Sequence, residues 1–219
     1  MAVKNRFAEY FEMFLGVLLP KKKHSVVAQR QGTAAIIQRL APIQNNDHLA
    51  FLSYRDVAIK HFLYAIKYER HRESITLAAD IFWEYISGEA QEEEALQKMH
   101  YALCAIPITQ ERKRRNGYNH LYAMLDVFYH HASDAGLHIQ DKRGLLAWTR
   151  QVSRQSVLQD RSERLRNVSG AMTATERLPP NTICFVIDDV TTTGATLTEA
   201  RRVLMKHGAH TVITLALAH

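Results

Sequence analysis

Hydrophobic residues in the first part of this chain recur with a helical period. The stripe Phe7, Tyr10, Phe11, Phe14, Leu15 and Leu18 predicts an amphipathic helix that ends at Pro20. A further helix is expected from about Thr33, and Pro42 with the turn-forming residues 45–47 closes this part of the chain. We therefore expect residues 1–47 to form an N-terminal helical appendage.

From residue 48 onward, short apolar runs alternate with helical stripes. The stripes predict helices around residues 59–66, from Ser74 as N-cap to Gly88, and over 118–132 and 197–207, and the acidic residues 89–94 are expected to form a solvated connection. The strand-like runs cover residues 49–54, 101–106, 144–149, 183–187 and 211–218. Parallel strands need crossover connections and are apolar on both faces. This order predicts an α/β fold with a parallel sheet flanked by helices over residues 48–219.

Composition makes this an ordinary folded protein and excludes several other classes. Hydrophobic residues make up 47% of the chain and charged residues 23%, as in average globular proteins. The apolar run at residues 13–20 is far shorter than the roughly 20 residues that cross a bilayer, so we expect no membrane span and a cytoplasmic protein. Cys104 and Cys184 lie in separate predicted strands, which suits small buried side chains better than metal ligands or a disulfide.

The charge distribution indicates an anionic partner. The formal net charge is +6, and basic residues cluster at 21–23, 112–115 and 150–166. Charge alone does not distinguish a phosphorylated small molecule from a nucleic acid. For single-stranded DNA, aromatic residues should lie among the basic ones, and only Tyr118, Tyr122 and Trp148 are candidates.

The segment 184–196 carries the clearest chemical pattern. An apolar strand ends in two acids, a threonine-rich loop follows, and a helical stripe begins directly afterwards. In open α/β sheets, ligands bind at the carboxyl ends of the strands, where this loop is expected. A helix N-terminus offers backbone N–H groups to a phosphate, threonine hydroxyls add donors, and a glycine allows close approach. The predicted phosphate loop consists of Val190, Thr191, Thr192, Thr193, Gly194, Ala195 and Thr196.

The two acids before this loop are candidates for contacts with a sugar. Ionised Asp188 and Asp189 accept hydrogen bonds, which suits ribose hydroxyls, and they are also placed to hold Mg²⁺ through water, although the protein alone provides no metal site. The alternative is that both acids only cap the following turn. A ligand is the better account because adjacent carboxylates at the end of an apolar strand are costly to bury. Neither G-x-x-x-x-G-K-[ST] nor G-x-G-x-x-G occurs.

This segment resembles the motif that binds 5-phosphoribosyl-1-pyrophosphate (PRPP) in type I phosphoribosyltransferases. With Tyr54, Lys67-Tyr68 and the stretches 106–108, 114–119, 155–158 and 164–171, the chain from about Leu49 onward is similar to the ComF (GntX-like) family, which is linked to competence and DNA uptake. The resemblance implies a type I phosphoribosyltransferase-like fold with a small hood. It also implies Mg²⁺-dependent transfer of the phosphoribosyl group from PRPP to an unidentified nitrogenous acceptor, with release of pyrophosphate.

The resemblance also assigns residues to parts of this site. The phosphate loop would hold the 5-phosphate, and Asp188 and Asp189 the ribose hydroxyls. Residues 150–166 would cover the site. For the arginines, a solvated basic loop, a nucleic-acid patch or a charged helix face remain alternatives. The pyrophosphate side would consist of Pro107, Ile108, Thr109, Arg112, Arg115, Arg164 and Arg166.

The chain departs from the family pattern at two places. The family commonly begins with a four-cysteine zinc module, whereas Lys21–Lys23 follow Pro20 here without any cysteine, so we expect no zinc. The usual Arg-Gly-aromatic-Asn-Gln becomes Asn116-Gly117-Tyr118-Asn119-His120, with the arginine displaced by one position. No residue stands out as a general base. A PRPP or nucleotide sensor without turnover and an accessory factor in DNA uptake are the alternatives, and a homodimer is left open.

Overall fold

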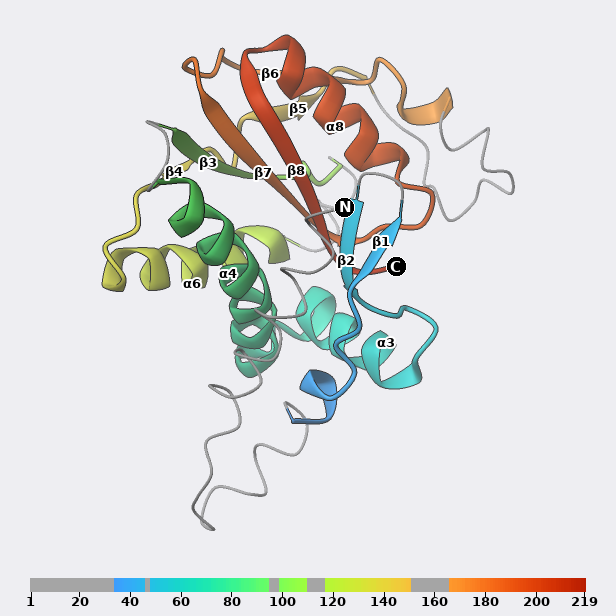
Figure 1. Ribbon diagram of the computed structural model, residues 1–219. Coiled ribbons are helices and arrows are strands. Elements are labelled where there is room, and N and C mark those ends of the chain that lie inside the picture. The colour runs from blue at the N-terminus through green and yellow to red at the C-terminus, as the bar shows by residue number, and fades with distance from the viewer. Residues whose placement is uncertain (1–33, 46–47, 95–98, 110–116, 151–165) are drawn as a thin grey trace.

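A six-stranded sheet forms the centre of the protein (Figure 1). The structure is a computed structural model that describes residues 34–45, 48–94, 99–109, 117–150 and 166–219. The strand order is β1-β2-β8-β7-β3-β4, and every pairing is parallel except that of β1 with β2. These strands are β1 (Ile43–Asn45), β2 (His48–Leu52), β3 (His100–Ala105), β4 (Ile139–Asp141), β7 (Thr182–Val190) and β8 (Ala209–Ala218).

Helices cover both faces of this sheet. Figure 1 shows α4 and α6 on one face and α8 on the other. Because α6 connects β3 to β4 and α8 connects β7 to β8, each crossover returns to a parallel neighbour. The predicted α/β fold with a mostly parallel, helix-flanked sheet is therefore confirmed. The helices are α3 (Val57–Tyr64), the π-helix η1 (Ala65–Glu69), α4 (Arg72–Glu94), α6 (His120–Asp134) and α8 (Ala195–Lys206).

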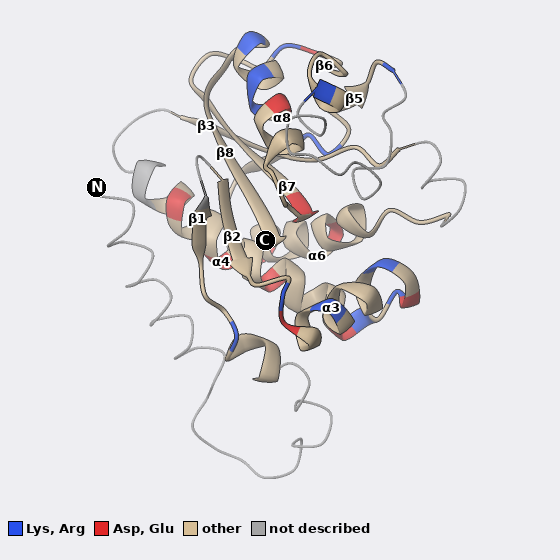
Figure 2. Ribbon diagram, turned by 90° about the vertical axis from the view of Figure 1, so that its right-hand side faces the viewer, with Lys and Arg blue, Asp and Glu red and all other residues tan. Residues whose placement is uncertain are grey.

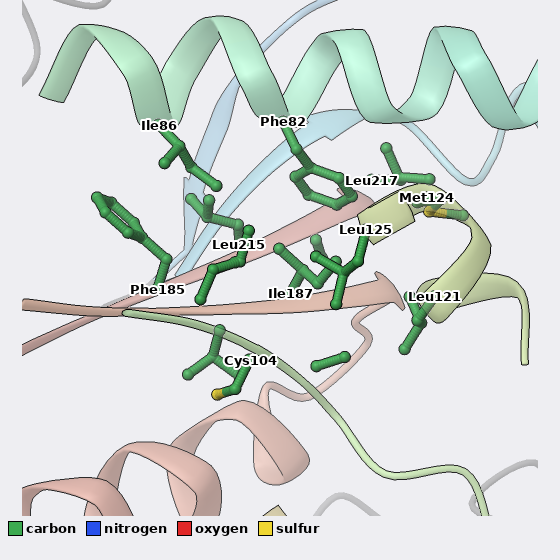
Figure 3. Packing of buried hydrophobic residues seen from close by; sticks show 14 of the residues in the cluster. Phe82, Ile86, Cys104, Leu121, Met124, Leu125, Phe185, Ile187, Leu215 and Leu217 are labelled. Atoms are coloured by element: carbon green, nitrogen blue, oxygen red, sulfur yellow. The ribbon is translucent and has the colours of Figure 1, made fainter. Parts of the chain in front are cut away.

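The core lies mainly between the sheet and the pair α4 and α6. Figure 3 shows Phe82 of α4 and Leu125 of α6 pointing toward Phe185, Ile187 and Leu215 of the central strands, and all five are at most 1% exposed. Burial of one such side chain contributes about 1.5–3 kcal/mol. The central strands have apolar residues on both faces because helices cover both faces.

The two cysteines lie side by side inside this core. Cys104 and Cys184 are free and fully buried in the paired strands β3 and β7, with their Sγ atoms 3.9 Å apart. They therefore act as the small buried side chains that the sequence predicts.

Both predicted boundaries of one helix are wrong, and at its end tertiary packing outweighs a local stop signal. The helix expected from Ser74 to Gly88 runs from Arg72 to Glu94, so Ser74 is not the N-cap and residues 89–94 are helical rather than a connection. Ile86 and Ala90 are both fully buried on either side of Gly88. A glycine costs a helix interior only about 1 kcal/mol, which this burial exceeds.

The predicted strand 144–149 does not join the parallel sheet. Residues Leu146–Trp148 form β5, which pairs antiparallel with β6 (Met172–Ala174) in a separate two-stranded sheet. The sequence predicts neither β6 nor the edge strands β1 and β4, because each has only three residues. Three residues are too few for a visible two-residue period.

Part of the predicted appendage belongs to the same core. Residues 34–37 are helical, as expected from about Thr33, and Ile36, Ile37 and Leu40 are buried. Strand β1 extends the main sheet. The predicted helix over residues 7–18 lies outside the described residues. Within the described part of the chain, no helix has the length and apolar character needed to cross a membrane.

Candidate functional site

The acids and the phosphate loop lie at the carboxyl edge of the sheet. Ala218, the last residue of β8, is opposite both Leu52 of β2 and Val190 of β7, and Ala105 of β3 is opposite Ile187. The strands β2, β8, β7 and β3 therefore end at one edge, with the end of β7 between those of β8 and β3. Figure 2 shows acidic residues at the tip of β7. Ligands of open parallel sheets bind at this edge.

The phosphate loop connects the end of β7 to the start of α8. The backbone N–H of Thr191 donates to the carbonyl of Ala218 at 2.9 Å, which anchors the first residue of the loop to β8. Gly194 is the N-cap of α8 and has φ +75°, and its carbonyl accepts the N–H of Thr198 at 2.8 Å. Because glycine has no side chain to cap the helix, a bound anion can take the place of an N-cap side chain at the first turn.

The other residues of the phosphate loop differ in how far they are exposed to solvent. Thr192 is exposed and Thr196 is half-buried at the beginning of α8. Thr193 is also half-buried, and its Oγ1 accepts the N–H of Ala195 at 3.4 Å. Val190 is half-buried and Ala195 buried, which leaves them as backbone contributors. The loop thus places its threonines beside a helix N-terminus, and their contact with a phosphate stays a prediction.

Asp188 and Asp189 point to opposite faces of the sheet. Successive residues of a strand alternate in direction, and Ile187 faces α4 and α6 (Figure 3). Asp189 faces the same way, while Asp188 faces the side of α8 and the phosphate loop. Asp188 is half-buried, and its Oδ1 accepts the N–H of Asp189 at 2.8 Å.

Asp189 is buried and bound on the α6 side of the sheet. Its Oδ2 lies 2.8 Å from Nζ of Lys67 in η1 and 2.5 Å from Nε2 of His120, the first residue of α6, and only 5% of the residue is exposed. Burial alone would raise the pKa of Asp189, but the Lys67 charge and the His120 hydrogen bond outweigh it and hold the pKa well below its ordinary value.

The sequence assigned both acids to a ligand because carboxylates are costly to bury, yet Asp189 is buried among groups of the protein itself. The cost of burying Asp189 is offset by a cation and a hydrogen bond, so the residue supports the fold as well as the site. The sequence analysis missed Lys67 and His120 as site residues. Lys67 lies in Lys67-Tyr68, which carries part of the family resemblance, and this was the available signal for it. His120 directly follows the stretch 114–119, at a position where the chain departs from the family pattern.

Asp189→Asn is expected to lower the free energy of unfolding by about 2 kcal/mol at neutral pH, because the amide removes the charge that Lys67 faces. The pKa of Asp189 is lowered in the folded protein, so its contribution is present above the unfolded pKa of about 4 and is lost as the pH falls below it. Urea unfolding of both proteins at pH 7, 5 and 3 measures this. A gap that stayed constant down to pH 3 would contradict the ion pair.

Some of the residues predicted on the pyrophosphate side lie at the same edge. Pro107, Ile108 and Thr109 follow β3 and are half-buried, and the carbonyl of Pro107 accepts the Nε1–H of Trp148 at 2.7 Å. Because Ala105 pairs with Ile187, these residues leave the edge beside the β7 acids. Arg112, Arg115 and Arg164 lie outside the described residues.

Arg166 is described and exposed, and its segment contacts α8. The N–H of Gly170 donates to Oε1 of the buried Glu199 at 2.9 Å, and Glu199 also binds Arg202. The segment 166–170 is thus anchored on α8 one turn beyond the phosphate loop. The contact of Arg166 with a ligand stays a prediction.

The aromatic residues named for single-stranded DNA pack against other groups of the protein. The Arg70 guanidinium lies 4.7 Å from the ring centroid of Tyr118, and that of Arg143 lies 5.5 Å from the centroid of Tyr122. Trp148 is half-buried and bonded to Pro107. These observations do not support DNA binding.

The described residues contain no group of three or more His, Cys, Asp or Glu side chains arranged to hold a metal ion. Asp188 at the loop nevertheless fits the chemistry of Mg²⁺, which is commonly held by one or two carboxylates together with substrate phosphates and water. Any magnesium site here would therefore include the ligand.

Comparisons with known proteins give limited similarity. No protein-family model and no curated protein matches the chain. Among solved structures, it is similar to a hypoxanthine phosphoribosyltransferase from Trypanosoma cruzi, with 10% identity and a TM-score of 0.38 over 72% of this chain. Another is the hypoxanthine phosphoribosyltransferase from Staphylococcus aureus, with 12% identity and a TM-score of 0.34 over 66% of this chain. The alignments span 64% and 62% of the lengths of those two chains.

Proposed function

We propose that this protein binds PRPP at the carboxyl edge of its sheet and transfers the phosphoribosyl group to a nitrogenous acceptor, with release of pyrophosphate. The observation that carries the proposal is the continuous path from Asp188 through the threonine-rich loop to the N-terminus of α8. The N-terminus of α8 suits a phosphomonoester. The carboxylate of Asp188, near the end of β7 and just before the loop, suits the sugar hydroxyls.

The proposed roles of the two acids differ because their surroundings differ. Asp188 faces the phosphate loop and is half-buried, so we assign it the ribose hydroxyls. Asp189 is occupied by Lys67 and His120 on the opposite face. It would accept a ribose hydroxyl only through exchange of one of these partners, and we assign it mainly to holding the end of β7 in place.

Catalysis would consist of positioning and charge stabilisation. Pyrophosphate leaves the anomeric carbon with its bonding electrons, and the acceptor nitrogen forms the new bond, so the site must stabilise a leaving group that gains negative charge. Mg²⁺, if bound with PRPP near Asp188, would supply part of this stabilisation. Residues Pro107–Thr109 and Arg166 are the described candidates for the pyrophosphate side.

Membership of the ComF (GntX-like) family is the finer form of this proposal. The pairing of Lys67 with Asp189 is consistent with it, because Lys67-Tyr68 carries part of the resemblance. His120 stands where the family pattern has glutamine, and it too contacts Asp189. The acceptor, the role in competence and a homodimer belong to this proposal without further support from the described residues.

Titration calorimetry with PRPP and Mg²⁺ tests the binding site. Asp188→Asn is expected to weaken PRPP binding about tenfold, since a hydrogen bond to a charged group contributes about 1.5–3 kcal/mol. Asp134→Asn is the matched control, because Asp134 is exposed at the last residue of α6, at the other end of the helix from the site. An equal affinity of both variants for PRPP would remove the ribose assignment.

Turnover is tested separately, by following pyrophosphate release with a panel of nitrogenous bases. Release with one base identifies a transferase and its acceptor. PRPP binding without release from any base would instead favour the sensor, which keeps the ligand site and has no catalytic activity.

A further inference from the structure

We infer that His48 is a positioning residue that fixes the position of the phosphate loop relative to the sheet. This inference rests on the proposed function, because it concerns the same 5-phosphate site. His48 was not among the candidate residues predicted from the sequence. It lies on β2, far along the chain from the motif segment 184–196. Its side chain acts on the loop rather than on the ligand.

The imidazole joins the sheet to the first turn of α8. His48 is 4% exposed and is opposite Thr214 of β8. Its Nδ1 lies 2.6 Å from Oγ1 of Thr214, and its Nε2 lies 3.0 Å from Oγ1 of Thr198. Thr198 in turn donates its N–H to the carbonyl of Gly194, the first hydrogen bond of the helix. The ring therefore spans the layer between β8 and the residues that begin α8.

The same ring is in direct contact with the loop glycine. A Cβ atom at Gly194 would lie 2.5 Å from Cδ2 and 2.7 Å from Nε2 of His48, closer than a carbon atom can approach. Gly194 also has φ +75°, which disfavours any side chain. The backbone of the loop at Gly194 thus packs against the Cδ2–Nε2 edge of the imidazole, and the ring lies between Thr214 of the sheet and the start of α8.

A histidine suits this position for a chemical reason. Hydroxyl groups can both donate and accept, so Thr214 and Thr198 satisfy both ring nitrogens in either tautomer. A hydrocarbon side chain of similar size would remove both of these hydrogen bonds beside the loop. Because the ring is fixed at both nitrogens, the N–H groups of the loop are oriented before a phosphate arrives, which reduces the ordering cost of binding.

The inference predicts a loss confined to ligands that carry the 5-phosphate. His48→Ala is expected to weaken ribose 5-phosphate about tenfold, equivalent to roughly one lost hydrogen bond to a preorganised group. The affinity for magnesium pyrophosphate should change less than twofold, since residues 107–109 lie on a different strand end. His48→Gln, which keeps a donor and an acceptor, should recover part of the ribose 5-phosphate affinity. Titration calorimetry of each variant with both ligands gives the comparison.

Further variants keep the test decisive if His48→Ala does not fold. Thr198→Val removes only the bond from the ring to α8 and should lower ribose 5-phosphate affinity in the same direction. His131→Ala is the matched control, because it removes a histidine bonded to Asp80 in the α4 and α6 layer. Unchanged ribose 5-phosphate affinity in His48→Ala and Thr198→Val, or an equal loss for both ligands, overturns the inference. Failure of the unaltered protein to bind ribose 5-phosphate would instead overturn the proposed function.

Discussion

Replacing Lys67 by methionine is expected to lower the free energy of unfolding by about 3 kcal/mol. The variant leaves the carboxylate of Asp189 buried, with the hydrogen bond from His120 as its remaining contact among the three groups. Breaking a buried pair by removing one partner typically costs about 3–5 kcal/mol, and the lower value applies because 19% of the Lys67 side chain is exposed. Urea unfolding at pH 7 measures the loss.

Two comparisons separate this ion pair from a general effect of the substitution. Lys142→Met removes a lysine paired with the exposed Glu176 and should cost less than about 1 kcal/mol. The double variant Lys67→Met with Asp189→Asn should lose less stability than the two single variants together, by about 1 kcal/mol or more, because it removes both charges. A Lys67→Met loss no larger than that of Lys142→Met would show that Asp189 does not depend on Lys67.

Gly194→Ala is expected to cost about 3 kcal/mol in stability and to lower PRPP affinity by more than tenfold. An alanine at φ +75° costs about 1–2 kcal/mol, and its Cβ would in addition displace the His48 ring or the loop itself. Either movement shifts the N-terminus of α8 away from the position that binds phosphate. Thermal or urea unfolding and calorimetry with PRPP measure the two effects.

Gly136→Ala is the matched control for this substitution. Gly136 has φ +67°, and a Cβ there would meet nothing within 4 Å, so its loss reports the backbone cost alone. The difference between the two variants therefore measures the contact between Gly194 and His48. Equal losses of stability in the two variants would mean that the His48 ring moves aside without any loss of stability. Unchanged PRPP affinity in Gly194→Ala would place the phosphate elsewhere.

The burial of Asp189 changes how the paired acids are understood. The pattern of two carboxylates at a strand end suggested two equivalent ligands for one sugar. In the fold they face opposite sides of the sheet, and only Asp188 shares a side with the phosphate loop. The acid motif thus combines a half-buried carboxylate on the side of the phosphate loop with a buried one that ties β7 to η1 and α6.

The sequence alone determined the α/β class and the position of the phosphate loop. Both follow from local patterns: β3, β7 and β8 are continuous apolar runs because helices cover both faces, and residues 190–196 lie between a strand and a helix that are each visible in the sequence. The carboxyl edge of a parallel sheet is then the only place where such a loop can lie.

Only the tertiary structure decided which residues support the loop. His120 is 69 residues from Asp189, and His48 is 150 residues from Thr198, so no local period relates them. The helix α4 continues past Gly88 because Ala90 packs in the core, which a helix stop signal does not anticipate. Burial and long-range pairing arise when the sheet and its helices assemble, and they outweigh local preferences of about 1 kcal/mol per residue.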